Sequence, residues 1–209
     1  MKREIRIIRL LAKQYPEKRK TYLNHKTVFQ LVVATILSAQ CTDNQVNKVT
    51  KRLFRRYKSV SDFANARGSQ LEKEIKSTGY FRSKAKNILG SAKVIQSRFD
   101  GRVPKTMDEL LSLPGVGRKT ANIVLYAGYG MVEGIAVDTH VFRISHRLSL
   151  SNAKTPEKTE EDLMDTYPNR YWGDINHLYI AHGRRICQAR KPMCQQCILT
   201  NLCPKIDVK

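Results

Sequence analysis

The segment 113–120, Leu-Pro-Gly-Val-Gly-Arg-Lys-Thr, constrains the fold of this chain more than any other feature. An apolar run at 107–113 leads into the segment, and a second apolar run at 121–126 follows it. Proline fixes one φ angle, whereas glycine permits backbone conformations that residues with a side chain resist. The pattern therefore predicts two helices joined by a tight hairpin, with the second helix beginning near Gly117.

The first turn of the second helix combines a phosphate-binding geometry with a lysine. Free N–H groups at the start of a helix, with glycines beside them, can receive a phosphate. Lys119 lies in this turn beside Arg118. The helix dipole and the neighbouring cation both disfavour a protonated amine, which is the direction a nucleophile needs. A turn followed by a solvated surface lysine is the simpler interpretation, and a lone Gly-x-Gly motif would favour it.

Composition indicates a polyanionic partner. The 209 residues include 38 Lys and Arg against 18 Asp and Glu, which gives a formal net charge of +20. Such an excess points to nucleic acid or to an anionic membrane surface. Because the basic residues are spread through the chain, a folded basic face is favoured over a charged tail. The length suffices for one large domain or two small ones.

The sequence contains neither a membrane span nor a secretory signal that we can recognise. Its most apolar stretch, 28–37, is interrupted by Gln30 and is shorter than the roughly 20 residues that cross a bilayer. Arginines interrupt the apolar runs at the N-terminus, unlike in a signal peptide. We therefore expect a soluble intracellular protein, cytoplasmic or nucleoid-associated if prokaryotic, that acts as a monomer.

Helical periodicity of apolar residues runs along most of the chain, and no alternating strand pattern is convincing, so we predict an all-α fold. Asp138 is placed to cap a helix through Leu148. The other expected helices include an N-terminal helix ended by Pro16, then 28–38, 43–57, 61–66, 70–77, 83–99, one begun by Thr106, one begun by Thr155-Pro156, and 174–187.

Two segments between these helices are candidate binding loops. Gln40 lies at the junction between the 28–38 helix and the next one, where a glutamine is usually a loop residue satisfied by water or backbone. The segment 80–84, Tyr-Phe-Arg-Ser-Lys, follows a glycine and predicts a protruding loop near nucleic acid. One of its two aromatic residues is expected to anchor in the core instead.

Asp138 is the candidate acidic partner of Lys119. The two residues lie 19 positions apart and are joined by one helix and a glycine-containing loop, a path that can fold back on itself. Helix capping alone would justify an aspartate at this position. The functional hypothesis adds that its carboxylate faces a pocket shared with Lys119, which sequence alone does not establish.

Four cysteines near the C-terminus predict a metal centre. Cys187, Cys194, Cys197 and Cys203 are separated by six, two and five residues, so their thiolates can surround one tetrahedral ion or one cubane cluster. Zinc ribbons usually pair two Cys-x-x-Cys knuckles, and only one such pair is present, which favours iron–sulfur while zinc stays the alternative. Cys41 stands apart and is most simply a small buried residue.

Taken together, four segments resemble the endonuclease III family of helix–hairpin–helix base-excision glycosylases. They are 37–43 with Leu-Ser-Ala-Gln and Thr-Asp, 113–122, 136–143 with Ala-Val-Asp-Thr-His-Val-Phe-Arg, and the four cysteines. The match extends in order over nearly the whole chain. It departs from the family in lacking a proline before Asp138 and in having Tyr80 where an apolar wedge, often leucine, is usual.

The resemblance implies a fold with two helical lobes. Residues 21–131 would form a six-helix barrel that contains the helix–hairpin–helix. Residues 1–20 and 132–209 would form a discontinuous helical domain, in which the four cysteines hold a [4Fe-4S] cluster.

The resemblance also implies an activity and a set of roles. The enzyme would remove oxidised pyrimidines from duplex DNA and cleave the abasic site by β-elimination, with Lys119 as nucleophile and Asp138 as catalytic carboxylate. Its partner would be double-stranded DNA with damaged pyrimidines or abasic sites. Candidate DNA contacts are Gln40, which would fill the gap left by the flipped base, Tyr80 as the wedge, and Gly115, Val116, Gly117, Arg118 and His140.

Three other functions fit parts of the pattern. An adenine-mismatch glycosylase of the same superfamily usually lacks the lysine at the hairpin, so Lys119 argues against it. A non-catalytic DNA-binding module with a metal-stabilised tail would need the hairpin and the charge, but not Lys119 and Asp138 together. A redox carrier would use the cluster, although the large positive charge does not especially suit small-protein electron transfer.

Overall fold

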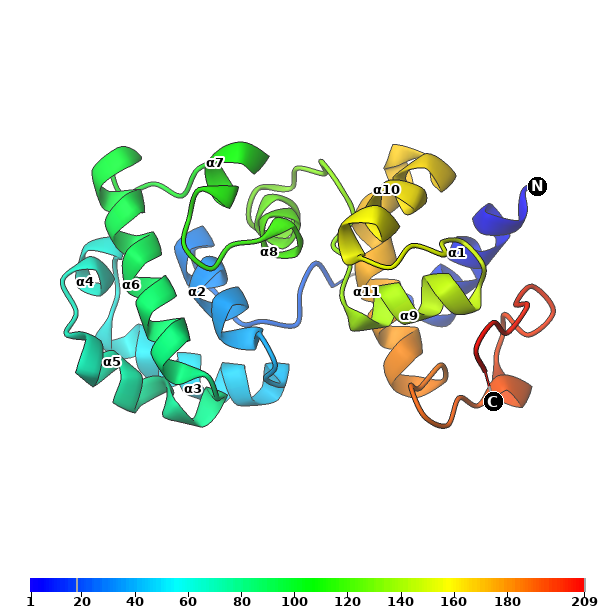
Figure 1. Cartoon of the computed structure of the whole chain (residues 1–209), viewed down its shortest axis with the longest axis horizontal. Coiled ribbons are helices and arrows are strands. Elements are labelled where there is room, and N and C mark those ends of the chain that lie inside the picture. The colour runs from blue at the N-terminus through cyan, green and yellow to red at the C-terminus, as the bar shows by residue number, and fades with distance from the viewer. Residues whose placement is uncertain (18, 209) are drawn as a thin grey trace. The chain divides into compact units, whose positions relative to one another are not determined.

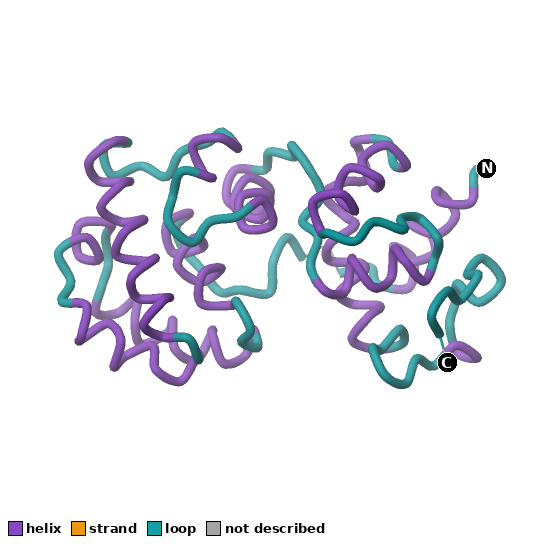
Figure 2. Tube along the Cα trace, viewed as in Figure 1, coloured by secondary structure: helices purple, strands orange, loops and turns teal. Residues whose placement is uncertain are grey.

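Helices and loops make up the described chain, as the periodicity predicts. The structure is a computed structural model that describes residues 1–17 and 19–208, and within them no residue lies in a β-strand (Figure 2). The all-α prediction is therefore confirmed. The chain divides into two compact units (Figure 1). The central unit comprises Thr21–Met131, and the terminal unit comprises Met1–Lys20 together with Val132–Lys209.

The central unit is built around a helix that is buried on almost every side. Helix α2 is apolar through most of its length, and Thr27 caps it by accepting a hydrogen bond from the Gln30 N–H at 3.2 Å. Helices α4 and α5 pack against α6, and α2 also contacts α6. The elements of this unit are α2 (Val28–Ser38), α3 (Asp43–Arg56), α4 (Val60–Ala64), α5 (Gly68–Ile75), η1 (Lys76–Thr78), α6 (Phe81–Arg98), α7 (Met107–Leu111), α8 (Arg118–Ile123) and η2 (Val124–Tyr129).

Two details of the central unit differ from the sequence-based expectation. Helix α6 begins at Phe81 rather than Ser83, so most of the expected loop at 80–84 is the first turn of a helix. The helix after the hairpin changes from α to π geometry at Val124 and ends at Tyr129, where Gly130 caps it with a φ of 73°. The π segment packs against α2, so a wider helical turn is accommodated inside the core.

The terminal unit joins the two ends of the chain. Ile7, Ile8 and Leu11 of α1 are buried against helices from the C-terminal part, α11 among them. Its core also holds the hydrogen-bonded hydroxyls of Tyr167 and Tyr179, 3.1 Å apart, and burial raises the pKa of Tyr167 to about 12. The elements are α1 (Arg3–Gln14), α9 (Thr139–Arg147), α10 (Pro156–Thr166), η3 (Asn169–Tyr171), α11 (Trp172–Arg185) and η4 (Cys194–Gln196).

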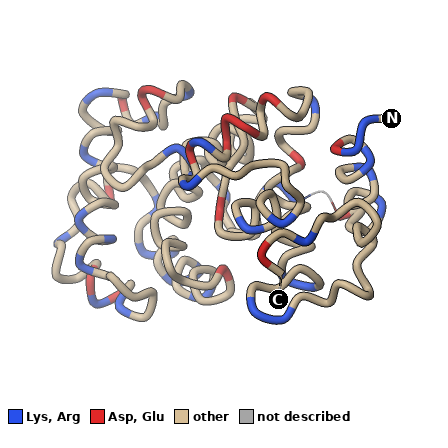
Figure 3. The backbone as a smooth tube through the Cα atoms, turned by 45° about the vertical axis from the view of Figure 1, so that its right-hand side comes forward, with Lys and Arg blue, Asp and Glu red and all other residues tan. Residues whose placement is uncertain are grey.

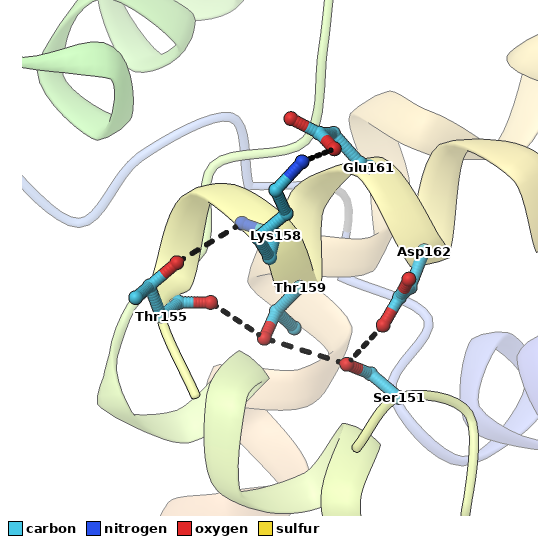
Figure 4. A network of polar contacts seen from close by, with 6 residues as sticks. All are labelled: Ser151, Thr155, Lys158, Thr159, Glu161 and Asp162. Carbon is cyan, nitrogen blue, oxygen red and sulfur yellow. Dashed lines mark hydrogen bonds and ion pairs between the residues drawn. The ribbon is translucent and has the colours of Figure 1, made fainter. Parts of the chain in front are cut away.

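Helix α10 begins with the capping pattern expected from Thr155-Pro156. The Thr155 hydroxyl accepts a hydrogen bond from the Lys158 N–H at 3.3 Å, and Pro156 occupies the first helical position, where its missing N–H costs nothing. Ser151 fastens the preceding loop to this helix by donating to Asp162 Oδ2 at 2.6 Å (Figure 4). Polar contacts thus fix the start of α10 and the loop before it.

No helix in the described part of the chain is both long and apolar enough to cross a bilayer.

Candidate active site

The hairpin between α7 and α8 packs on the core with one side and exposes the other. Leu113 and Val116 are buried, and the Val116 N–H donates to the Leu113 carbonyl at 3.1 Å, which closes the turn. The Ser91 hydroxyl of α6 donates to the Pro114 carbonyl at 2.7 Å. Gly115 and Gly117 are exposed. The apolar residues therefore hold the turn on the core, while its glycines face outward.

The two hairpin glycines have different physical roles. Gly115 has a φ of 78°, and a Cβ atom there would lie 2.7 Å from the Cβ of Asn87, so both its backbone and its surroundings require glycine. Gly117 is the N-cap of α8 with a φ of −100° and a ψ of 178°, and a Cβ atom there would meet open space. Only Gly115 is needed to form the turn, whereas Gly117 keeps the start of α8 uncovered.

Lys119 lies in the first turn of α8, as the sequence predicts. No side chain caps this helix within the described part of the chain, so its first N–H groups are not engaged by a capping residue. Arg118 and Lys119 are both half-buried. An amine thus stands beside a helix start that can bind an anion.

Asp138 caps α9 in the terminal unit. Its Oδ1 atom accepts hydrogen bonds from the N–H groups of His140 and Val141, both at 2.9 Å. Both bonds use the same oxygen, so Oδ2 takes no part in the cap. The His140 ring is held by Arg143, whose Nη2 lies 3.1 Å from His140 Nδ1. One carboxylate can therefore serve the helix and still present an oxygen for chemistry.

Lys119 and Asp138 belong to different units, the former to the central and the latter to the terminal unit. The start of α8 positions Lys119, and the start of α9 positions Asp138. The sequence predicts both of these helix starts.

Gln40 and Tyr80 occupy two strained loop tips of the central unit. Their φ angles are 51° and 46°, in the left-handed region that residues with a side chain seldom adopt. Such a conformation costs on the order of 1–3 kcal/mol and persists only where surrounding contacts impose it. Gln40 is exposed, and the Tyr80 side chain is 66% exposed. Phe81 packs against the core, so it is the anchoring aromatic residue.

The lysine of the segment 80–84 is buried rather than exposed. Lys84, expected in a protruding loop, is only 4% exposed. Its ammonium donates to the Leu37 carbonyl at 2.8 Å and to the Thr78 carbonyl at 2.7 Å. The polar neighbours of Lys84 in the sequence do not predict its burial, because its acceptors are backbone carbonyls of other elements.

The four C-terminal cysteines line one cavity of the terminal unit. The described residues contain no group of three or more His, Cys, Asp or Glu side chains arranged to hold a metal ion. Burial raises the pKa of Cys197, the Leu199 N–H partly offsets this, and the other three cysteines raise it further. Neighbouring thiols therefore disfavour the ionised form of Cys197, an effect that a cationic centre would reverse. Cys41, expected to be buried, is partly exposed beside the core of the central unit.

Arg147 supports this cysteine loop and was not singled out by the sequence. Its buried guanidinium donates to the carbonyls of Gln188 and Ala189 at 2.7 and 2.8 Å, and its Nη1 lies 3.3 Å from Cys187 Sγ. A charged donor next to a sulfur stabilises a thiolate. Its position on α9 made it a plausible surface arginine by sequence alone.

Positive charge is distributed over both units. Lys and Arg occur along the helices and loops of each unit rather than in one terminal tail (Figure 3). Both the hairpin and the cysteine loop contain basic residues, among them Arg118 and Arg190.

Comparison with known families decides what this arrangement is. Residues 33–169 match the HhH-GPD superfamily of base excision DNA repair proteins. The chain belongs to this superfamily. Within it, the chain is 50% identical over 202 residues to endonuclease III of Synechocystis, covering 97% of this chain and 92% of the relative. It is 39% identical over 191 residues to endonuclease III of Escherichia coli, covering 90% of each.

Solved structures of the superfamily agree. A trapped endonuclease III–DNA covalent intermediate matches with a TM-score of 0.92 at 41% identity, covering 98% of this chain and 97% of that one. A thermostable thymine-DNA glycosylase, at 24% identity and a TM-score of 0.83, shares the fold. The resemblance to the endonuclease III family that the sequence motifs indicated is confirmed.

Proposed function

We propose that Lys119 and Asp138 carry out the chemistry of this base-excision repair enzyme. The enzyme is a DNA glycosylase with abasic-site lyase activity, and it acts on duplex DNA. The observation that carries the assignment of Lys119 is its position in the first turn of α8, beside an uncapped helix start on an exposed hairpin. An amine in that position can reach the sugar of a nucleotide whose phosphate is bound by the hairpin.

We infer that the substrates are oxidised pyrimidines. The damaged base is extruded from the stack, at a cost of a few kcal/mol that is smaller for a poorly paired base. The neutral amine of Lys119 then attacks C1′ of the sugar, and the bond from C1′ to the base breaks with the electron pair leaving on the base. Asp138 stabilises the positive charge that develops on the sugar.

The covalent adduct accounts for strand cleavage. Loss of a proton and opening of the sugar ring convert the adduct into a Schiff base between Lys119 and C1′. Removal of a proton from C2′ then expels the 3′ phosphate by β-elimination, which cuts the strand on the 3′ side of the lesion. Hydrolysis of the Schiff base returns the free amine.

Gln40 and Tyr80 are proposed to occupy the gap that the extruded base leaves. Both side chains project from exposed loop tips of the central unit, and both can stack or hydrogen-bond with unpaired bases. His140 is proposed as a further DNA contact from the start of α9.

Duplexes that carry either an oxidised pyrimidine or a preformed abasic site test this function directly. Borohydride should trap the enzyme on both substrates, because each passes through the Schiff base. Trapping on the abasic site alone would restrict the activity to the lyase step, and trapping on neither would refute the function.

The hairpin glycines yield a prediction that separates folding from binding. Gly115→Ala should destabilise the protein by about 1–2 kcal/mol from its left-handed backbone alone, with the Asn87 contact adding to this. Gly117→Ala should change stability by about 1 kcal/mol or less, because its backbone is extended and its surroundings are open.

Both variants should weaken DNA binding, which can be followed by fluorescence anisotropy over a range of salt concentrations. The wild-type logarithm of affinity should fall linearly with the logarithm of salt, by roughly 0.9 per phosphate neutralised. Unchanged affinity of Gly117→Ala would show that the hairpin does not contact phosphate.

Cys187, Cys194, Cys197 and Cys203 are proposed to hold a [4Fe-4S] cluster. The four cysteines line one cavity of the terminal unit, so their thiolates can bind a single centre. A cubane cluster takes one thiolate at each of its four irons, and the single Cys-x-x-Cys pair is unlike the two knuckles of a zinc ribbon. The cluster would supply cross-linking of the loop rather than a step of the reaction, since Lys119 and Asp138 suffice for that.

Purified protein should therefore be yellow-brown and contain about four irons per chain. Cys197→Ser should lower solubility and stability before it lowers activity per folded molecule, because the thiolate holds the loop together. Iron and zinc analysis with visible absorbance checks this, and stoichiometric zinc in colourless protein would contradict it.

A further inference from the structure

Lys84 is a buried cation that binds backbone rather than a carboxylate. Its Nζ donates to the carbonyls of Leu37 and Thr78 at 2.8 and 2.7 Å. Burial lowers the pKa of Lys84, and the Cys41 thiol partly opposes this. A charge removed from water is costly unless it is well hydrogen-bonded. The lysine therefore does more than fill space in the core, because it supplies donors to two backbone carbonyls.

The two carbonyls lie at the ends of elements that lead into the strained loop tips. Leu37 is in the last turn of α2, whose carbonyls have no partner within the helix, and Gln40 follows three residues later. Thr78 ends η1, and Tyr80 follows two residues later. A cation at the carbonyl end of α2 also has favourable electrostatics. One ammonium therefore joins the bases of both tips.

The elements next to these two segments, α3 and η1, are also in contact. The Gln45 amide of α3 donates to the Ser77 hydroxyl of η1 at 2.8 Å. The Lys84 N–H donates to the Tyr80 carbonyl at 3.0 Å, which is the backbone hydrogen bond that begins α6. Gln40 and Tyr80 lie on neighbouring segments that share Lys84 as a common support.

We propose that Lys84 is a positioning residue that holds residues 38–42 and 78–81 together as one rigid wedge for insertion into DNA. The proposal rests on the proposed function, because it takes Gln40 and Tyr80 as the side chains that enter the duplex. The strained φ angles of both tips persist because their bases are fixed from within. Without the ammonium, each tip would relax separately and the two side chains would no longer enter the gap in register.

Three variants test this role. Lys84→Met removes the donors but keeps the length of the side chain, and Lys84→Arg keeps the charge and the donors. Lys86→Met is the matched control, because it removes the same charge from an exposed position two residues away on α6. The probe is a duplex with a tetrahydrofuran abasic analogue opposite 2-aminopurine, whose fluorescence reports how the base opposite the gap is stacked.

We expect the saturating fluorescence change seen with wild type and Lys86→Met to be largely lost with Lys84→Met. Its kcat/KM on a duplex with an oxidised pyrimidine should fall about tenfold or more, the scale of losing hydrogen bonds from a charged donor. Borohydride trapping on single-stranded abasic DNA should be unchanged, because no duplex has to be opened. Lys84→Arg should recover part of the fluorescence change and of the rate.

Folded Lys84→Met with wild-type fluorescence and duplex activity would overturn the proposal. If Lys84→Met does not fold, hydrogen exchange of the wild-type protein tests the proposal instead. The Cys41 amide is bonded to the Ser38 carbonyl, and the Gly79 amide is bonded to the Lys76 carbonyl. The two amides should exchange with the same opening free energy if one support holds both segments. Different opening free energies for the two amides would refute Lys84 as a support shared by both segments. Wild type that gives no trapped adduct would refute the proposed function instead, so the two failures are distinguishable.

Discussion

Lys119→Gln should abolish both borohydride trapping and strand cleavage at abasic sites while leaving DNA affinity nearly intact. Only an amine can form the Schiff base; water could release a base but could not drive β-elimination in the same way. Glutamine is close to lysine in length and helix propensity, so α8 should form as before. Trapping, cleavage and anisotropy on one abasic duplex measure the three properties together.

The matched control for this variant is Lys93→Gln. Lys93 is an exposed lysine of α6 in the same unit, so the same chemical change is made outside the hairpin. It should trap and cleave like the wild type. A covalent adduct that still forms with Lys119→Gln would mean that another amine is the nucleophile and that the assignment of Lys119 is wrong.

Asp138→Asn should slow base release by roughly two to three orders of magnitude, the scale of losing one preorganised electrostatic partner. The fold should survive, because an asparagine Oδ1 can accept the same hydrogen bonds from the His140 and Val141 N–H groups. Trapping on a preformed abasic site should be less affected, because that sugar opens to an aldehyde without base expulsion. Single-turnover rates on the two substrates measure the difference.

Alanine variants separate the cap from the chemistry. Asp138→Ala should lose about 1 kcal/mol of stability in addition to its activity, since the cap of α9 is removed. Thr155→Ala removes the cap of α10 in the same unit and should lose similar stability while keeping base release. Equal base-release rates for Asp138→Asn and wild type would show that the negative charge of Asp138 has no catalytic role.

Local interactions made much of this protein predictable from its sequence. Helix periodicity and caps act over three or four residues, so neighbouring residues alone predict the all-α class, the helix starts at Val28 and Asp43, and the cap at Asp138. The hairpin is equally local: Pro114 and Gly115 produce the turn, and Lys119 follows in the first turn of the next helix. The cysteine spacing likewise indicated a shared site.

Other features of the protein depend on contacts between residues far apart in the chain, so only the tertiary structure reveals them. Asn87 of α6 determines that Gly115 cannot carry a side chain, whereas Gly117 faces open space. Arg147 is fixed by carbonyls of the cysteine loop 41 and 42 residues later. None of these contacts leaves a trace in local periodicity.

The burial of Lys84 is the clearest example of a feature that only the tertiary structure reveals. Its place after Tyr80, Arg82 and Ser83 predicts an exposed loop lysine. Its burial is decided by the Leu37 carbonyl, 47 residues earlier, and by the end of η1. A side chain that satisfies backbone carbonyls has no partner residue type to reveal it, because every residue has a carbonyl. The sequence therefore indicates the role proposed for Lys119, whereas only the fold indicates the role proposed for Lys84.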